Sequence, residues 1–282
     1  MSSSTKAEMT TRQLPRVDIA LAKQLERAEA MANASTVEAR QAVSPEVGAE
    51  WIEVAGAYAM FDGPEAPTTQ TFGIGLYDRF LDSEFATVEK FFDGHNTTTF
   101  HEVCSFAAHE TQGLLSERGY TPFEPSVVLL RSTANHSSAK PGAVTTRAIE
   151  ADELPTWCRV AGEAWSNESP ELGEFVAKLG DIWGQTRGIT CFLAERDAEP
   201  IASAAINIAN GIAIMAGAAT IPSARRHGAQ LALFDARLAF AAERGIELAM
   251  VVTAPGGGSQ RNSERQGFRP VYSRMKWKRA LA

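Results

Sequence analysis

The residues best suited to do chemistry form a short basic segment that follows an apolar run. Arg225, Arg226 and His227 come directly before Gly228, where an amphipathic helical pattern starts. The first turn of a helix presents unpaired backbone N–H groups and a partial positive charge, and a glycine lets an anion approach them closely. Arginines add charge-assisted hydrogen bonds. The segment predicts a pyrophosphate site, and a solvated helix start with two surface arginines is the alternative.

The elements around this segment alternate between helices and strands. The dipeptide Asn210-Gly211 is the strongest hairpin signal in the chain. Hydrophobic periodicity predicts the remaining elements of the second half. They are a strand at 144–149, helices at 152–165 and 170–183, strands at 189–196, 200–208 and 211–220, a helix at 228–244, a strand at 247–253, a helix at 259–266 and a strand at 269–278.

The first half begins with a helix that Asp18 caps and that Ser44-Pro45 ends. Residues 132–142 are small and polar and close on Pro-Gly, which is typical of a linker. The other expected elements are strands at 51–61 and 69–77, a helix at 83–93, a strand at 98–105, a helix at 108–118 and a strand at 126–131. The expected domain plan is a disordered tail at 1–16, a domain at 17–135, a linker at 136–143 and a second domain at 144–282.

An internal repeat relates the two halves. Ser-Glu-Arg-Gly-Tyr at 116–120 resembles Ser-Glu-Arg-Gln-Gly-Phe at 263–268. Setting Gly119 against Gly267 aligns strand 99–105 with 247–253, the helix with Phe92 with the helix with Phe240, and strand 68–75 with 216–223. A kept order of elements indicates duplication. The basic loop has no counterpart, because bulky and acidic residues occupy 77–82 of the first copy.

Two motifs of the second half resemble those of the GCN5-related N-acetyltransferases, the GNAT superfamily. Pro222-x-x-Arg225-x-x-Gly228 is similar to the coenzyme A loop of that family, and Gln230 departs from it at a position where Gly or Ala is usual. Arg261-Asn262-x-x-Arg265-x-Gly267-Phe268 is similar to the helix and turn that close the site. The resemblance covers about residues 144–279. It implies an α/β (α+β) fold of two tandem domains, each a mixed, mostly antiparallel sheet flanked by helices, with a degenerate first copy.

The resemblance also implies a reaction and its cosubstrate. A primary amine, on a small molecule or a peptide, would attack the thioester of acetyl-CoA directly, without a covalent enzyme intermediate. Backbone groups of the strand before the loop would contact the pantetheine arm and the thioester carbonyl. The residues assigned to acetyl-CoA are Ala218, Ala219, Thr220, Arg225, Arg226, His227, Gly228, Ala229, Gln230, Asn262 and Arg265.

The catalytic and acceptor residues are less clearly marked. Ser263 stands where the family often has a tyrosine that protonates the leaving thiolate, and Tyr272 is a substitute candidate. Strand 212–220 contains no carboxylate that could act as a general base. For the acceptor, Glu163 and Glu168 could hold a cationic amine, with Trp165 or Trp183 as a wall of the pocket. Each of these four is also a common surface or core residue.

Composition narrows the classes of function. The net charge is −7 and the pI about 5.4, which argues against nucleic acid as a partner. Cys104, Cys158 and Cys191 lie far apart, so neither a disulfide framework nor a zinc site is expected, and no metal is assigned. A polar start and the lack of a long apolar run predict a cytoplasmic protein without membrane contact.

The sequence leaves several questions open. A homodimer is compatible with it, and the acceptor amine is not identified. The alternative to an acetyltransferase is a non-catalytic protein that binds acyl-CoA as a sensor or scaffold. A purely structural tandem domain would bind no coenzyme.

Overall fold

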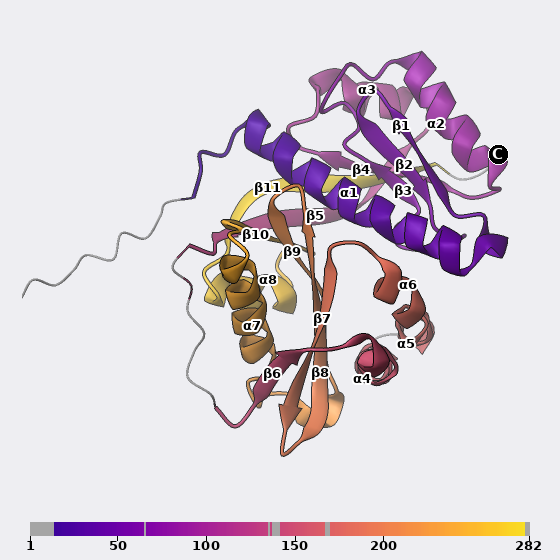
Figure 1. The fold of residues 1–282 in the computed structure, drawn as a ribbon. Coiled ribbons are helices and arrows are strands. Elements are labelled where there is room, and N and C mark those ends of the chain that lie inside the picture. Colours follow the sequence, from indigo (N-terminus) through magenta and orange to yellow (C-terminus); the bar gives the residue numbers. More distant parts are fainter. Residues whose placement is uncertain (1–13, 65, 135, 137–141, 167–169, 280–282) are drawn as a thin grey trace, which may run out of the picture.

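The computed structural model describes residues 14–64, 66–134, 136, 142–166 and 170–279. The strands of these residues form one eleven-stranded sheet in the order β1-β2-β3-β4-β11-β5-β10-β9-β8-β7-β6 (Figure 1). The strands are β1 (Glu50–Val54), β2 (Ala57–Phe61), β3 (Gln70–Phe72), β4 (Thr99–Cys104), β5 (Thr121–Ser132), β6 (Thr145–Ala148), β7 (Ile189–Arg196), β8 (Glu199–Ala209), β9 (Ile212–Thr220), β10 (Leu248–Thr253) and β11 (Arg269–Arg279).

Helices flank this sheet, and only the pairs β3–β4 and β9–β10 are parallel among the described strand pairs. The predicted fold of mixed, mostly antiparallel sheets flanked by helices is therefore confirmed. The helices are α1 (Ile19–Val43), α2 (Asp82–Gly94), α3 (His109–Glu117), α4 (Leu154–Ser166), α5 (Pro170–Ala177), α6 (Gly180–Gln185), α7 (Ala229–Glu243) and α8 (Gly258–Arg265), with short 3₁₀ turns at Pro45–Val47, Ala151–Glu153 and Pro222–Ala224.

The last strand of each half crosses into the other half. β5 pairs antiparallel with β10, from Leu248 opposite Ser132 to Thr253 opposite Val127. β11 pairs antiparallel with β4, and β5 and β11 pair with each other at the centre of the sheet. Each half is thus completed by a strand of the other. The predicted domain limits stay a prediction, since residues 1–13 of the tail and 137–141 of the linker lie outside the described residues.

The repeat of elements is visible in the structure. β4, α3 and β5 have the same order and nearly the same lengths as β10, α8 and β11. Gly119 and Gly267, which align in the sequence, have φ values of 81° and 82° and follow the equivalent helices. The alignment of strand 68–75 with 216–223 is wrong, because Thr71 lies opposite His101 as Ala213 lies opposite Ala249. The second copy is therefore longer between this strand and the next helix.

Local signals explain where α1 begins and ends. Asp18 caps it as predicted, since its side chain accepts a hydrogen bond from the backbone N–H of Leu21 at 3.0 Å. The helix ends at Val43, directly before Ser44-Pro45. The prediction of one strand at 51–61 is wrong. Ala55 and Gly56 have φ values of 47° and 78° and form a tight turn between two strands.

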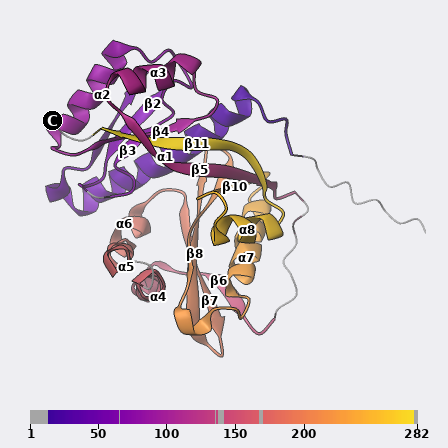
Figure 2. The same cartoon turned by 180° about the vertical axis from the view of Figure 1, so that it is seen from behind.

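Helices cover both faces of the sheet. Figures 1 and 2 show α4, α5 and α6 on one side of the C-terminal strands and α7 on the other. α1 lies across both halves. Leu25 packs in a core with Ile214 and Met250 of the second half, whereas Val37 packs in a core with Met60 of the first half. α1 therefore buries apolar surface against both copies and fixes them relative to each other.

A buried charge cluster joins α1 to the centre of the sheet. Arg274 of β11 is fully buried, and its Nε lies 2.6 Å from Oε1 of Glu26. Its Nη1 lies 2.5 Å from Glu29 and 3.7 Å from Glu102. Glu26 also accepts a hydrogen bond from the hydroxyl of Tyr272 at 2.7 Å. The cluster sets three carboxylates from the first half against one guanidinium from the second.

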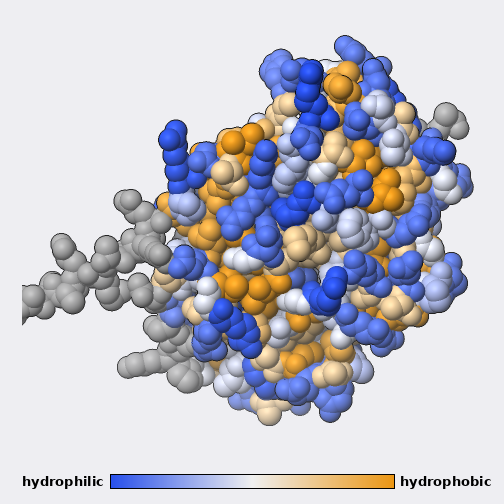
Figure 3. Space-filling model, turned by 45° about the horizontal axis from the view of Figure 1, so that its top comes forward, coloured by the Kyte–Doolittle hydropathy of each residue, from blue (hydrophilic) through white to orange (hydrophobic). Residues whose placement is uncertain are grey.

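The surface is mixed in character. In the face that Figure 3 shows, hydrophobic patches are separated by hydrophilic residues. None of the described helices combines the length and the apolar composition that crossing a bilayer requires.

The strand exchange predicts that neither half folds alone. We expect fragments 1–143 and 144–282, expressed separately, to lack a cooperative thermal transition, because β4, β5, β10 and β11 would each lose a neighbouring strand. Co-expression should restore one cooperative transition close to that of the intact chain. Circular dichroism against temperature is the measurement. A single fragment that unfolds cooperatively with full stability would contradict the exchange.

The charge cluster predicts a pH dependence of stability. Burial raises the pKa of Glu26 from 4.5 to about 7, although Arg274 opposes this shift. Because the folded state then binds the proton more tightly, the free energy of unfolding falls as pH rises from 4.5 through 7. Between pH 5 and 7.5 the wild type should lose about 2 kcal/mol more than Glu26→Gln, whose amide cannot ionise. Urea unfolding at both pH values measures this difference, and parallel losses would refute it.

Candidate active site

The cavity of the second half opens where two parallel strands diverge. β9 and β10 pair only from Ile212 opposite Leu248 to Ile214 opposite Met250. Beyond this point β9 also bulges away from β8, since Ala219 lies opposite Ser203 but Ala216 lies opposite Ala205. One cavity of about 1290 Å³ lies against this part of β9. The bulge takes Gly217 and Ala218 out of the ladder, so backbone polar groups face the cavity region instead of a strand.

Gly217 of the bulge allows a close approach by an aromatic side chain. Its φ is 59°, a conformation that a glycine adopts without steric cost. A Cβ atom at this position would lie 3.0 Å from Cη2 of Trp183 and 3.7 Å from Cζ2 of Trp157. The two tryptophan rings, whose centroids are 5.0 Å apart, thus rest against the bulge. A larger residue than glycine would displace them.

The start of α7 lies on the cavity wall and has the features of an anion site. Gly228 is the N-cap with φ 85°, and neither a side-chain cap nor an acidic residue occupies the first turn. The N–H groups of this turn therefore have no intrahelical partner. Arg226 has a φ of 69°, which bends the loop just before the helix. Free amides, the helix dipole and two nearby arginines together favour phosphate.

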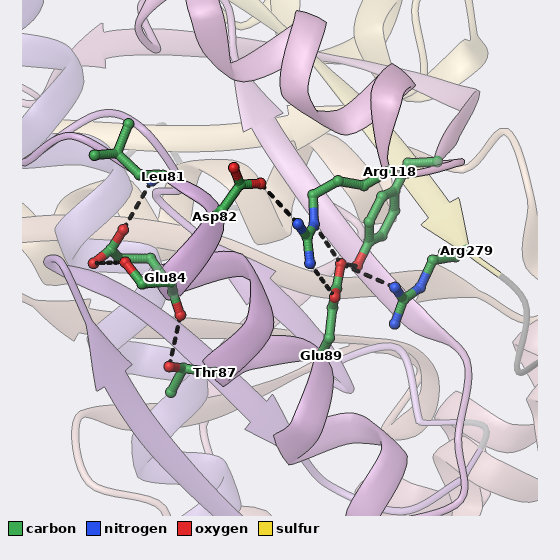
Figure 4. A network of polar contacts seen from close by, with 9 residues as sticks. Leu81, Asp82, Glu84, Thr87, Glu89, Arg118 and Arg279 are labelled. Atoms are coloured by element: carbon green, nitrogen blue, oxygen red, sulfur yellow. Dashed lines mark hydrogen bonds and ion pairs between the residues drawn. The ribbon is translucent and has the colours of Figure 1, made fainter.

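The equivalent helix of the first copy is closed to anions. Figure 4 shows Glu84 bonded to the backbone of Leu81 at the start of α2, where the N–H of Leu81 donates to Oε2 at 2.9 Å. This backbone hydrogen bond lowers the pKa of Glu84. Asp82 adds a second carboxylate to the same turn and pairs with Arg118 at 2.8 Å. In the first copy, the carboxylates of Asp82 and Glu84 thus occupy the helix N-terminus.

Around the loop, most of the predicted cosubstrate residues line the cavity. Gln230 turns its side chain to β9, where its Nε2 donates to Oγ1 of Thr220 at 3.1 Å, which leaves the helix start open. His227 is the exception, since its Nδ1 lies 2.9 Å from the carbonyl of Arg225 within the loop. The predicted residues on the cavity wall are Ala218, Ala219, Thr220, Arg225, Arg226, Gly228, Ala229, Gln230, Asn262 and Arg265.

The predicted proton donors lie elsewhere. Ser263 is fully buried and its hydroxyl donates to the carbonyl of Ser259 at 2.9 Å. Tyr272 is bonded to Glu26, and burial raises the pKa of its hydroxyl. Neither belongs to the cavity wall of the described residues. Their catalytic roles stay predictions, and their positions give these roles no support.

The predicted acceptor residues are only partly brought together. Trp165 lines the cavity, and so does Trp183. Glu163 is exposed and lies 4.0 Å from Arg159 on the surface of α4, away from the cavity wall. Glu168 lies outside the described residues.

Three charged residues on the wall were missed by sequence reasoning, namely Glu29, Asp62 and Arg237. Glu29 comes from α1 in the first half, and no local pattern links it to the second half. Arg237 is 1% exposed, and its Nη1 donates to the carbonyls of Ala205 and Ala216 at 3.0 and 3.3 Å. Burial lowers its pKa to about 9. An arginine on the apolar face of α7, next to Leu238, was the signal that could have revealed it.

Comparisons with known proteins agree with this geometry. Residues 150–268 match the acetyltransferase (GNAT) family. A GCN5-related N-acetyltransferase from Kribbella flavida is similar with a TM-score of 0.64 and 18% identity, over 88% of this chain and 96% of that one. One from Sphaerobacter thermophilus has a TM-score of 0.53 and 14% identity, over 95% and 96% of the two chains. No curated protein matches the chain.

A third solved structure bears on the repeat. A tandem GNAT protein from the clavulanic acid biosynthesis pathway has a TM-score of 0.53 and 15% identity, over 70% of this chain and 68% of that one. At these identities the similarity concerns the fold. Taken with the family match, residues 150–268 form a domain of the GNAT acetyltransferase family, and the described residues before them repeat part of its order of elements.

Proposed function

We propose that this protein transfers an acetyl group from acetyl-CoA to a primary amine carried by a small molecule or a peptide. The observation that carries the proposal is the uncapped start of α7 beside the gap between β9 and β10. A helix start suited to phosphate and an exposed strand edge meet there at one cavity. The first copy has the equivalent helix but not the free helix start.

Different parts of the cavity wall match different parts of acetyl-CoA. The first-turn amides of α7, with Arg225 and Arg226, would hold the pyrophosphate. Asn262 and Arg265 of α8 bond to each other at 3.0 Å and would cover the coenzyme from the other side. Ala218 and Ala219 of β9 would bond the pantetheine arm through their backbone groups. Gln230 does not obstruct this arrangement, because its side chain is already bonded to Thr220.

The chemistry asked of the protein is positioning and charge stabilisation. The neutral amine nitrogen forms a bond to the thioester carbon and the carbon–sulfur bond breaks. The nitrogen loses one proton as the amide forms, and the leaving thiolate takes up one. Backbone N–H groups of the bulge at Gly217 and Ala218 would stabilise the oxyanion that develops. Arg237 holds the carbonyl of Ala216, directly before the bulge, and brings a buried positive charge near it. We assign to Arg237 the role of positioning the bulge.

One prediction of the proposed function concerns acetyl-CoA binding. Acetyl-CoA at about 100 times its Kd should stabilise the wild type by about 2.7 kcal/mol, which corresponds to a rise in Tm of roughly 5 °C. Gly228→Glu should abolish this rise, because it places a carboxylate at the anion site. Differential scanning fluorimetry with and without ligand measures the shift.

Gly245→Glu is the matched control for that variant. Gly245 follows α7 at its other end, has a φ of 71°, and like Gly228 has open space around an added Cβ. Both variants thus carry the same chemical change and similar backbone strain, and Gly245→Glu should keep the shift. No shift in the wild type at millimolar acetyl-CoA would sink the proposal. A shift without turnover of any amine would favour the acyl-CoA-binding sensor instead.

Another prediction of the proposed function concerns Arg237. Arg237→Met removes the donors to the carbonyls of Ala205 and Ala216, so the bulge loses its support. We expect kcat to fall roughly 10²-fold with a much smaller change in the KM for acetyl-CoA, the size of effect seen when an oxyanion donor is disturbed. Arg237→Lys, which keeps a buried cation, should recover part of kcat. Steady-state kinetics, with a melting curve for each variant, provide the test. An unchanged kcat in the folded Met variant would exclude the role.

A further inference from the structure

The end of the cavity away from α7 is built by elements of both halves. α1 contacts both α6 and β8. Two hydrogen bonds fix it there: Asn210 donates to the carbonyl of Gln24 at 3.3 Å, and the N–H of Arg187 donates to the hydroxyl of Ser35 at 3.1 Å. The part of α1 between these contacts faces the cavity with Glu29, Ala32, Asn33 and, one turn on, Thr36. This spacing is one face of a helix.

The two carboxylates on this wall differ in how they are neutralised. Asp62 pairs with Arg40, whose Nε lies 2.5 Å from Oδ1 of Asp62, and it accepts a further hydrogen bond from the hydroxyl of Thr68 at 2.6 Å. Glu29 has to share Arg274 with two other carboxylates, as described above. Burial raises the pKa of Glu29 despite that arginine, and a cation beside it would favour the ionised form. Of the two carboxylates at this end, Glu29 is therefore the one with less compensation from positive charge.

A second, independent feature at this end is a buried side-chain oxygen that lacks a hydrogen-bond donor. Asn207 of β8 is 6% exposed, lines the cavity, and its Oδ1 has no hydrogen-bond partner among the described residues. It lies opposite Ile189 and Ile214 in the sheet. The oxygen itself is buried beside Gly188, and a buried amide oxygen without a donor costs free energy, so a turn of this side chain toward an occupant that donates would be favoured. An ammonium group has three N–H donors and no acceptor.

The remaining wall is aromatic and apolar. Trp165, Phe175 and Trp183 line the cavity from α4, α5 and α6. Such rings suit a flat apolar body, and their faces attract a cation. The arginines of the cavity gather instead around α7 and α8, with Arg237 under β9. The cavity is thus basic at one end and acidic at the other.

We propose that the acidic end binds the acceptor as an ammonium ion with an aromatic body and no carboxylate of its own, held by Glu29 and Asn207. The inference rests on the proposed function, since it names the acceptor class of the same site. A carboxylate on the acceptor would lie near Glu29, which would repel it. The first copy of the fold thereby supplies the acceptor wall for the second.

The test is calorimetric titration of the full chain with 2-phenylethylamine, without acetyl-CoA. The wild type should bind it at least tenfold more tightly than 2-phenylethanol, which lacks the charge, and phenylalanine, which adds a carboxylate. Glu29→Gln should weaken binding of the amine at least tenfold. Glu38→Gln is the matched control on the same helix, because Glu38 is 41% exposed and pairs with Arg187 outside the cavity.

Asn207→Leu separates a binding role from a structural one. Leucine has a similar volume and removes a buried amide oxygen that has no partner, so the variant should be at least as stable as the wild type. It should nevertheless bind 2-phenylethylamine more weakly. A loss of stability in this variant would show that Asn207 serves the fold, and it would overturn its assignment to the acceptor.

The outcomes distinguish this proposal from the proposed function. Equal affinity for the amine and the alcohol, or unchanged binding in Glu29→Gln, would overturn the acceptor site even if acetyl-CoA binds and other amines are acetylated. Amine binding that depends on Glu29 would support the site even in a protein that shows no thermal shift with acetyl-CoA. The shift with acetyl-CoA should persist in Glu29→Gln, because Glu29 lies away from the loop at Arg225.

Discussion

The antiparallel pairing of β5 with β11 is the constraint on which the other elements depend. Each of these strands ends one copy of the fold and lies beside the other copy, so their contact joins the four strands β1 to β4 and the five strands β6 to β10 into one sheet. The buried cluster at Arg274 lies on this seam and adds α1 to it. Because removing one partner of a buried ion pair leaves charge without compensation, the seam tolerates little change.

The cavity is a consequence of where this sheet is continuous and where it is not. β10 keeps its pairing with β5 along its whole length but leaves β9 after three residues. The gap that results is bounded by α7 at the basic end and by α1 at the acidic end. A copy whose own helix start is occupied by Glu84 still contributes a part of the wall, through α1 and the residues around Asp62. The first copy has therefore lost its own anion site but is still needed, because it forms a part of the cavity of the second copy.

Much of this could be predicted from local sequence, because caps, turns and hydrophobic periods act over a few residues. The cap at Asp18, the loop before α7 and most element limits are of this kind. The turn at Ala55 was missed because Ala-Gly is a weak turn signal beside Asn-Gly. Glu29, Arg237 and the exchanged strands depend on pairings between distant segments, which no local pattern records. Ser263 and Tyr272 were assigned by position in a motif, whereas their hydrogen bonds direct them away from the cavity.

The position of β11 also constrains how the chain acquires its fold during synthesis. β11 follows every other described strand in the sequence but lies between β4 and β5. Until it emerges from the ribosome, β4 has an unpaired edge and Glu26, Glu29 and Glu102 have no arginine partner in their cluster. The first copy therefore cannot mature ahead of the second, as domains made in series usually do. Some 150 further residues are translated between the synthesis of β5 and that of β11. During this time the unpaired edge of β4 must be prevented from pairing with strands of other chains.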